Sequence, residues 1–567
     1  MKAGKKLTLF LSSLLCLVAI LVSACGGEGG TTPGNGSKAG DDKQILRYSV
    51  VGDPDIHTFD PAYVSDTDSN FPIQAVYTGL VTLNKKLEVV PQLAKDIQVS
   101  DDGTTYTFKL RDGLKFSNGD PLTAEDVVYS INRAIDKKTA SDVAGYLQLV
   151  KGFADLHGGK TDTLIGKSLI AKDPQTVVIQ IEYPAAYFLQ SLTYPTSYVV
   201  NKKLIEKYGD KWTDHAEEGG GAGPFKVEKY THNQGIDLVV NENYYGKKPQ
   251  LKKLQVLFYK DQEAMYRAYQ ANQLEFSPVP TASLEQERTS PGFKDTPILT
   301  VRYIAMNYLV KPFDNLKIRQ AFALAIDKDQ VVKSAMKNSF TPTNHIVPNG
   351  MVGYNEKLTG PQGASTKGDP EKAKQLLEEG MKEAGYNGVS NLPPITLTYY
   401  PRNQNFRDAI NIIVQRWKNV LGVNVQVSVV TRPKLLDLTT GTKGNGNLQM
   451  WQAGWNADYP DPQDWLTLFF GKGQDYNQFN YGLGNIKELK EMKDVQDMLV
   501  QADKEPDKTK RMALYNQIEQ KVVEHVGWLS LWQEKVQYLV KPNVHGLELN
   551  SQQLIPPEDW SDIYITQ

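Results

Sequence analysis

Cysteine is almost absent from this chain of 567 residues, which has only Cys16 and Cys25. Both lie within the first 25 residues, so the sequence beyond them can form no disulfide, cysteine-ligated zinc site or thiol nucleophile. The rest of the chain must therefore be stabilised by ordinary hydrophobic cores, and a chain of this length can bury several.

Motifs for catalysis are also missing. The seven histidines never occur four residues apart or in an H-E-x-x-H pattern, and there is no G-x-S-x-G sequence. Gly159-Lys160-Thr161 resembles a phosphate-binding loop only until Ala154 is found where that motif requires glycine. Carboxylate pairs on loops, such as Asp461 and Asp464, are usually solvated. We therefore predict that the chain is not an enzyme and holds no metal and no cofactor.

An excess of basic charge is lacking as well. The formal net charge is −2, and it falls to −5 if the three lysines of the N-terminal leader are removed. Because a phosphate backbone is held by clustered Lys and Arg side chains, we expect no nucleic-acid partner.

The N-terminus has the layout of an export signal. Lys2, Lys5 and Lys6 precede an uncharged, Leu- and Val-rich run over 7–22, which is shorter than a membrane-spanning helix prefers. The run ends in LVSAC at 21–25, which resembles a bacterial lipobox. This predicts a signal peptide over 1–24 and a lipid-modified Cys25 that anchors the chain to a membrane. An ordinary signal peptide with an incidental cysteine is the alternative.

Residues 25–43 are predicted to be the anchored, flexible tether. From Gly26 onward they are rich in Gly, Ser and Thr and show no apolar periodicity, and 18 such residues would reach roughly 23 Å on average. No second hydrophobic stretch is long enough to span a bilayer. We expect a body held at the outer face of the cell membrane of a Gram-positive bacterium.

The body mixes strand and helix patterns. Thr104 to Arg111 alternates apolar and polar residues and predicts a half-buried strand. Asn118-Gly119 predicts a turn, and Thr123 with Asp126 forms a capping-box signature before a helix.

A second strand–helix–strand unit follows further along the chain. Asp369-Pro370 predicts a helix start, with Gly380 or Gly385 as its end, and 395–399 alternates as a strand. Ile410, Ile413 and Trp417 mark another helix that Gly422 ends, and valines alternate over 423–429. This order argues for α/β layers.

Five segments of the body resemble the extracellular solute-binding family of oligopeptide and dipeptide receptors of ABC importers. They occur in the family's order, and the resemblance runs over nearly the whole body after the leader. They are FDP at 59–61, FSNG at 116–119 with TAEDVVYS at 123–130, GAGPF at 221–225 with NENYY at 241–245, IRQAFALAID at 318–327, and GWNADYPDP at 454–462.

The resemblance implies an α/β, periplasmic-binding-protein-like fold of the class II type, in which two lobes close over a cleft and the first lobe carries an extra inserted domain. By similarity, lobe I comprises three discontinuous segments, the inserted domain interrupts it, and lobe II is continuous. The expected boundaries are 44–77, 203–300 and 536–567 for lobe I, 78–202 for the inserted domain and 301–535 for lobe II.

The resemblance also implies a ligand site. Asp458 matches the acidic residue that receives a peptide's α-amino group. Gly454, Trp455 and Asn456 match the segment that lines the peptide as a neighbouring strand. The segment that flanks the peptide on its other side is matched by Ser65, Asp66 and Thr67. A tyrosine that some of these receptors place in the inserted domain corresponds to Val143, and Arg402 and Arg416 are basic candidates for the peptide's C-terminus.

Plainer interpretations exist for both acidic segments. Asp458 lies in an Asp-x-Pro-Asp-Pro sequence that is typical of turns. Asp66 to Asn70 reproduces the first half of a calcium loop, but Phe71 and Tyr77 occupy positions that need Gly and Glu, so a ligand-flanking or surface loop is the better interpretation.

The predicted function is capture of oligopeptides and delivery to ABC permease membrane subunits, whose partner ATPases consume ATP, and we expect a monomer. Within the same fold, the alternative is a receptor for another solute, such as a nickel chelate, haem or an oligosaccharide. From another class, a surface-anchored hydrolase or adhesin would also be exported, although no motif supports it.

Overall fold

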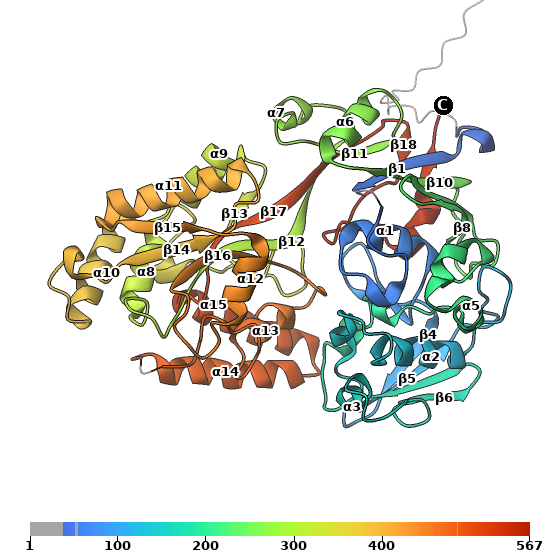
Figure 1. Ribbon diagram of the computed structural model, residues 1–567, viewed down its shortest axis with the longest axis horizontal. Coiled ribbons are helices and arrows are strands. Elements are labelled where there is room, and N and C mark those ends of the chain that lie inside the picture. Colours follow the sequence, from blue (N-terminus) through green and yellow to red (C-terminus); the bar gives the residue numbers. More distant parts are fainter. Residues whose placement is uncertain (1–37, 52–54, 485) are drawn as a thin grey trace, which may run out of the picture.

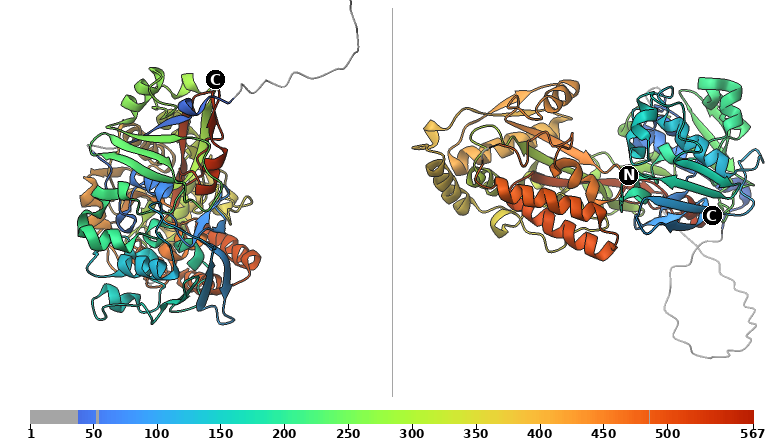
Figure 2. Two further views of the ribbon diagram at one scale, coloured as in Figure 1. Left: turned by 90° about the vertical axis from the view of Figure 1, so that its right-hand side faces the viewer. Right: turned by 90° about the horizontal axis from the view of Figure 1, so that it is seen from below.

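The computed structural model describes residues 38–567 except 52–54 and 485. The predicted signal peptide, Cys25 and most of the predicted tether therefore lie outside the described residues. Two masses of mixed α/β structure are joined by long strands (Figure 1), and they remain distinct when the molecule is seen from below (Figure 2).

Lobe I is built on a four-stranded sheet in the order β1-β10-β9-β8. Its first strand pairs in parallel with β10, so that Ile45 lies opposite Lys253. The strands of this lobe are β1 Ile45–Val51, β8 Phe225–Thr231, β9 Gly235–Val240, β10 Lys253–Tyr259, β18 Val544–His545 and β19 Tyr564–Ile565. Its α-helices are α1 Thr67–Val76, α5 Lys202–Tyr208, α6 Gln262–Gln270 and α7 Leu284–Glu287.

Residues 38–43, which were predicted to belong to the tether, pack on this lobe. The Ala39 N–H donates to the Ile565 carbonyl (2.9 Å), and the Gln44 side chain bonds both the Ala39 and the Ile565 carbonyls. Ala39 is buried. The folded body therefore begins several residues earlier than the composition suggested.

The inserted domain is a second four-stranded sheet, in the order β4-β5-β7-β6, with a β2-β3 hairpin beside it. Its strands are β2 Val81–Leu83, β3 Val89–Pro91, β4 Ala94–Val99, β5 Thr105–Leu110, β6 Leu169–Asp173 and β7 Thr176–Gln180, and its helices are α2 Ala124–Ile135, α3 Phe153–His157 and α4 Phe188–Ser191. The predicted strand and helix are both confirmed. In α2 the Asp126 carboxylate accepts from the Thr123 N–H (2.8 Å), as in a capping box.

Lobe II is built on the largest sheet, in the order β11-β17-β12-β16-β14-β15, with β13 also pairing with β17. The strands of this sheet are β11 Phe276–Pro278, β12 Phe293–Met306, β13 Thr341–Pro342, β14 Ile395–Tyr399, β15 Val425–Val429, β16 Met450–Asn456 and β17 Leu529–Val540. Of these, β11 lies beside β1 in lobe I, where it pairs with the end of β17. The helices are α8 Leu316–Leu324, α9 Lys328–Met336, α10 Pro370–Glu383, α11 Gln404–Leu421, α12 Arg432–Thr440, α13 Thr467–Phe470, α14 Leu489–Lys504 and α15 Lys508–Glu524.

Short 3-10 turns connect these elements in all three parts. They are η1 Asp41–Lys43, η2 Pro61–Tyr63, η3 Ala144–Leu147, η4 Pro195–Ser197, η5 Gly209–Glu218, η6 Pro361–Gly363, η7 Val389–Asn391, η8 Pro462–Asp464 and η9 Pro557–Asp562. Two of them, η3 and η8, lie next to the candidate site.

The predicted helix starts and stops in lobe II agree with the structure. The Asp369 carboxylate caps α10, and Gly422 ends α11 in the left-handed conformation. Gly380 was one of the two predicted ends of α10, but the helix continues through it. The glycine serves helix packing instead, because a Cβ atom at this position would lie 2.8 Å from Ile318 Cγ1 of α8. Val429, on the edge strand β15, is exposed.

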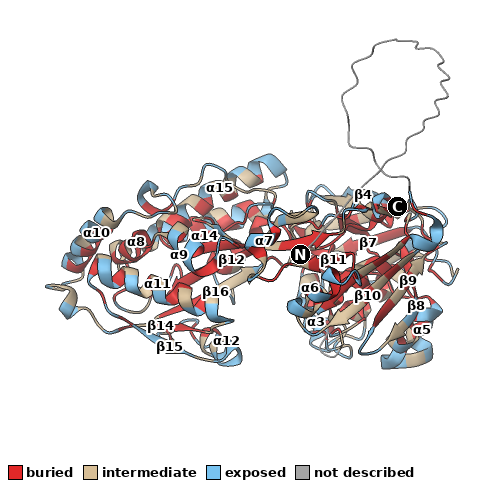
Figure 3. Cartoon of the chain, turned by 90° about the horizontal axis from the view of Figure 1, so that it is seen from above, coloured by how far each residue is buried: buried red, intermediate tan, exposed pale blue. Residues whose placement is uncertain are grey.

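Two long strands, β12 and β17, cross between the lobes (Figure 1). They pair antiparallel from Phe293 and Leu539 in lobe I to Ile304 and Leu529 in lobe II, and the register shifts between Pro297 and Val301. The predicted lobe boundaries at 300/301 and 535/536 fall within these strands. Separate hydrophobic cores lie on either side, and the central strands of lobe II are buried under exposed outer helices (Figure 3).

The buried Asp60 joins the inserted domain to lobe I. Its carboxylate accepts from Arg133 Nη1 of α2 (3.1 Å) and from Trp212 Nε1 of η5 (3.0 Å), and it also caps η2 through the Ala62 N–H. Removing one partner from a buried, hydrogen-bonded ion pair leaves the other charge uncompensated.

We expect Asp60→Ala to lower the free energy of unfolding by about 3–5 kcal/mol. Asp112→Ala removes an exposed ion pair with Lys95 and should change it by less than about 1 kcal/mol. Denaturant titration followed by circular dichroism measures both. Equal effects of the two substitutions would contradict this role for Asp60.

Candidate functional site

Asp458 lies two residues beyond the end of β16, in a tight loop that folds back on itself. Its N–H donates to Asp464 Oδ2 (2.9 Å), and the Trp455 indole Nε1 donates to the same oxygen (3.1 Å). The turn-forming carboxylate in this loop is Asp461, which caps η8 by accepting from the Gln463 N–H (3.0 Å). Turn formation is the alternative role that the sequence suggests for Asp458, and in the structure Asp461 has that role.

Only one of the three carboxylates in this loop is neutralised by a cation. Arg511 donates from both of its terminal nitrogens to the two oxygens of Asp461, and both side chains are almost fully buried. Within the described part of the chain, neither Asp458 nor Asp464 forms an ion pair.

The inserted domain contributes a tyrosine to the surroundings of Asp458. Tyr146, on η3, lies beside the Asp458 carboxylate, and the two residues line the same cavity. The Tyr146 ring stacks on Tyr194 with centroids 3.7 Å apart, and the Tyr194 hydroxyl donates to the Val64 carbonyl (2.9 Å). The contact thus runs from lobe II through the inserted domain to lobe I.

Val143, to which the resemblance assigned the family's tyrosine, is the residue that precedes η3. Tyr146 lies three residues further on, which is one turn of a 3-10 helix, and it is the tyrosine that this chain places beside Asp458.

Burial strongly affects the acidity of this pair of carboxylates. It raises the pKa of Asp458 to about 6, although the neighbouring Tyr146 hydroxyl lowers it in part. Burial, and then the neighbouring charge of Asp458, raise the pKa of Asp464 well above its usual range. Both groups would be stabilised as anions by a cation placed between the lobes.

A cavity of about 130 Å³ opens beside Asp458 and brings together the predicted site segments. Ser65, Asp66 and Thr67 line it from lobe I, and Asn456 and Asp458 line it from lobe II. The other lining residues are Asn70, Gln74, Tyr146, Thr193, Tyr194, Pro195, Leu299, Ala457, Gln552, Gln553 and Leu554.

Two acceptors in this cavity have no partner among the described residues. They are Asp66 Oδ2 and Asn70 Oδ1, both buried. The other oxygen of Asp66 caps α1 by accepting from the Ser69 N–H (2.8 Å). The segment 66–70, expected as a loop, is therefore the start of a helix, and its unpaired acceptors can receive N–H donors from a ligand.

The strand that leads to Asp458 has one open edge. Along its whole length β16 pairs with β12, but β14 pairs with it only at Met450 and Trp451. The Ala457 N–H donates to the Leu299 carbonyl, and bonding residues alternate along an antiparallel pair. The main-chain groups of Gly454 and Asn456 therefore point to the open edge, where an added strand could pair.

The Arg302 side chain crosses β16 at Gly454. A Cβ atom at Gly454 would lie 2.4 Å from Arg302 Nη1, so a larger residue there would displace this arginine. Arg302 Nε and Arg402 Nη1 both donate to Glu534 Oε1, at 2.6 and 3.0 Å. Two guanidinium groups thus share one carboxylate and leave a net positive charge beside β16.

Of the predicted residues, Gly454 and Trp455 lie outside the first cavity. Trp455 lines a second cavity with Asp458, and Gly454 lies against Arg302. Sequence reasoning missed Tyr146 and Asp464 as members of the site. Asp464 could have been suspected from its spacing, six residues after Asp458 across a Pro-rich turn.

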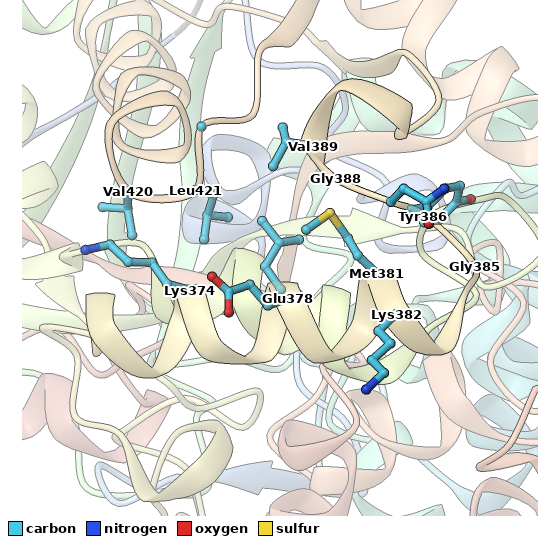
Figure 4. Close-up of a pocket in the computed structure, with 13 residues that line it drawn as sticks. Lys374, Glu378, Met381, Lys382, Gly385, Tyr386, Gly388, Val389, Val420 and Leu421 are labelled. Carbon is cyan, nitrogen blue, oxygen red and sulfur yellow. The ribbon is translucent and has the colours of Figure 1, made fainter.

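A larger cavity, of about 660 Å³, lies at the outer end of lobe II, away from the inserted domain (Figures 1 and 4). It separates the ends of α10 and α11, where Met381, Val389 and Leu421 face the same space (Figure 4). It shares no residue with the cavity at Asp458.

No group of three or more potential metal ligands occurs within residues 38–567, leaving aside the undescribed positions. Over the same residues, none of the helices is both long and apolar enough to cross a membrane.

Two lobes joined by crossing strands, with a cavity lined from both, define a binding protein of the two-lobed class. The chain belongs to the bacterial extracellular solute-binding proteins of family 5, whose model (the family's "Middle" region) matches residues 88–477.

Similar proteins include the oligopeptide-binding protein OppA of Bacillus subtilis (strain 168), which is 30% identical over 89% of this chain and 90% of its own length. Among solved structures, the unliganded open form of the periplasmic murein tripeptide-binding protein MppA superposes with a TM-score of 0.79 (25% identity; 94% of this chain and 99% of that one). Peptide-bound OppA of Listeria monocytogenes superposes with 0.65 (26%; 92% and 99%).

We predict that Asp458→Asn stabilises the ligand-free protein at neutral pH. A raised carboxyl pKa means that the folded state prefers the protonated form, so the cost of ionisation is fully present above about pH 6 and is lost as pH falls from about 6 towards about 4, where the unfolded carboxyl titrates. The variant should gain roughly 1–2 kcal/mol at pH 7.5 and about a third of that at pH 4.5.

Paired denaturant titrations at the two pH values test this, with the exposed Asp437→Asn as control. A gain that is the same at both pH values would show that Asp458 ionises normally in the folded protein.

Proposed function

We propose that this chain captures an extended oligopeptide between its lobes and delivers it to the membrane subunits of an ABC importer. The observation that carries the proposal is Asp458, a half-buried carboxylate without a cation, at the end of a strand whose edge is open. The relatives named for binding oligopeptides support it.

The peptide's α-amino group is placed at Asp458. A charge-assisted hydrogen bond to a buried carboxylate contributes about 1.5–3 kcal/mol, and it offsets the cost of holding that carboxylate away from water. Because every peptide with a free N-terminus carries this ammonium, the contact selects peptides without reading their side chains.

The peptide main chain is placed along the open edge of β16. Gly454 and Asn456 offer main-chain donors and acceptors there, and Asp66 and Asn70 offer side-chain acceptors from lobe I. Pairing as an added strand gives affinity that is independent of sequence. Since the two sets of groups lie on different lobes, a bound peptide favours closure, and the crossing strands β12 and β17 serve as the hinge.

The peptide's C-terminal carboxylate is placed near Arg402. This residue follows β14 on the side where β16 has no strand neighbour, and it shares Glu534 with Arg302, which lies against Gly454. Gly454 precedes Asp458 by four residues, or roughly 13 Å along an extended chain. That length fits a short peptide bound with both ends recognised.

The remaining assignments complete the proposal. The chain is a monomer without catalytic activity, anchored through Cys25 at the outer face of the cell membrane of a Gram-positive bacterium, and the lobes divide at the boundaries expected from sequence. A receptor for another solute is the competing assignment within the fold, and it would leave the open edge of β16 without a strand partner.

We expect free-amine tripeptides to bind the protein lacking residues 1–25 about ten- to a hundred-fold more tightly than their N-acetylated forms. Asp458→Asn should weaken the free-amine form by a similar factor and remove the effect of acetylation, because the two changes delete the same contact. Isothermal titration calorimetry measures all four combinations, with Asp437→Asn as control. Equal affinity for both peptide forms in the unmodified protein would refute the ammonium site.

Replacing Arg402 tests the other end of the peptide. We expect Arg402→Gln to weaken binding of free-acid peptides about five- to fifty-fold and to leave peptides with a C-terminal amide almost unaffected. Arg416→Gln, on α11, is the matched control. A loss of the same size for acid and amide peptides would assign Arg402 a structural role only.

A further inference from the structure

A second cavity, of about 370 Å³, adjoins the first at Tyr146 and Asp458, which line both. It lies between the inserted domain and lobe II, where the Ala186 N–H also donates to the Asp503 carbonyl. Its lining residues are Asp142, Val143, Gly145, Tyr146, Gln148, Leu149, Tyr187, Ser191, Trp455, Asp458, Tyr459, Asp464, Leu468, Gln474, Asp475 and Tyr476.

The charges that line this second cavity are all negative. Asp458 and Asp464 are its inner carboxylates, Asp142 and Asp475 are exposed at its rim, and none of the lining residues is Lys, Arg or His. Asp475 is paired with Lys443 (2.6 Å) outside the cavity. The inner pair has no such counter-charge among the described residues.

Asp464 gives an independent indication that a cation belongs here. Its side chain is 1% exposed, and Oδ2 accepts from the Trp455 indole and the Asp458 N–H. The other oxygen, Oδ1, is buried and has no partner in the described parts of the chain. An unpaired buried carboxylate oxygen is costly, and a positively charged donor inside the cavity would satisfy it.

The walls of the cavity are largely aromatic. Tyr146, Tyr187, Tyr459, Trp455 and Tyr476 line it, and the Trp455 ring packs edge-on against Tyr476 with centroids 5.0 Å apart. Aromatic faces attract ammonium and guanidinium groups and accommodate the aliphatic stem of a Lys or Arg side chain. Carboxylates at the end of an aromatic cavity therefore match a long cationic side chain.

We propose that this cavity is a side-chain pocket that selects a Lys or Arg residue near the N-terminus of the bound peptide. The peptide's α-amino group occupies Asp458 from the first cavity, and the cationic side chain enters the second cavity and pairs with Asp464. The inference rests on the proposed function and adds a preference to it: the receptor binds peptides in general but favours basic ones.

The test compares peptides that differ only in side-chain charge. Arg-Ala-Ala and Ala-Arg-Ala are titrated against their citrulline counterparts, which have nearly the same shape but no charge, and Ala-Ala-Ala measures binding that does not need the pocket. We expect at least one arginine peptide to bind ten-fold or more tightly than its citrulline form in the unmodified protein. This comparison needs no variant and decides the proposal by itself.

Asp464→Asn assigns the preference to this pocket. Asparagine keeps an acceptor for the Trp455 and Asp458 N–H groups but removes the charge, so the preference for arginine should fall to about two-fold or less while Ala-Ala-Ala binding is retained. Asp437→Asn, an exposed carboxylate that lines neither cavity, should keep the preference.

Two results would overturn the inference. If arginine and citrulline peptides bind equally while Ala-Ala-Ala binds, the pocket does not select charge and the peptide-receptor function stands. A preference that survives in a folded Asp464→Asn variant, checked by its melting temperature, would place the selecting group elsewhere. If no free-amine peptide binds at all, the proposed function itself fails.

Discussion

The site depends on a carboxylate that is buried without a cation. Asp458 is partly removed from water, lies beside a tyrosine from the inserted domain, and adjoins a second buried carboxylate at Asp464. Arg511 lies close by, but it forms its ion pair with Asp461. The folding of lobe II thus leaves uncompensated negative charge where the lobes meet, and a cationic ligand group can offset that cost.

The arrangement of strands places this charge at the end of a strand with an open edge. Because β14 leaves β16 after Trp451, the last part of β16 keeps an open edge that leads directly to Asp458. Exposed edges invite pairing with another chain, and here the edge faces acceptors from lobe I across a narrow cavity. In the proposed function, the strands β12 and β17, which carry the chain between the lobes, serve as the hinge that couples ligand binding to lobe closure.

Local sequence signals predicted several of the helices and strands. The alternation over 104–111, the capping carboxylates Asp126 and Asp369, and the helix stop at Gly422 each act within a few residues, and each is confirmed. Asp458 was singled out because the segment around it resembles a motif of the family, and in the structure it lines one cavity with Ser65, Asp66 and Thr67.

The sequence-based predictions failed where contacts between residues far apart in the chain determine the structure. Residues 38–43 have the composition of a tether, but the C-terminal strand offers their main chain hydrogen-bond partners more than 500 residues away. Tyr146 was missed because the 3-10 turn that brings it beside Asp458 leaves no signal in the sequence pattern. Asp464 has no ion-pair partner among the described residues because Arg511 bonds Asp461. The spacing of the two aspartates in the sequence does not show which of them pairs with the arginine.

The most direct test of this account is a crystal structure of the protein with a free-amine tripeptide. The account predicts the peptide nitrogen within hydrogen-bond distance of the Asp458 carboxylate, main-chain bonds to Gly454 and Asn456, and lobes rotated together about β12 and β17. A peptide bound with its amino group away from Asp458, or a different solute in the cleft with the edge of β16 still unpaired, would contradict it.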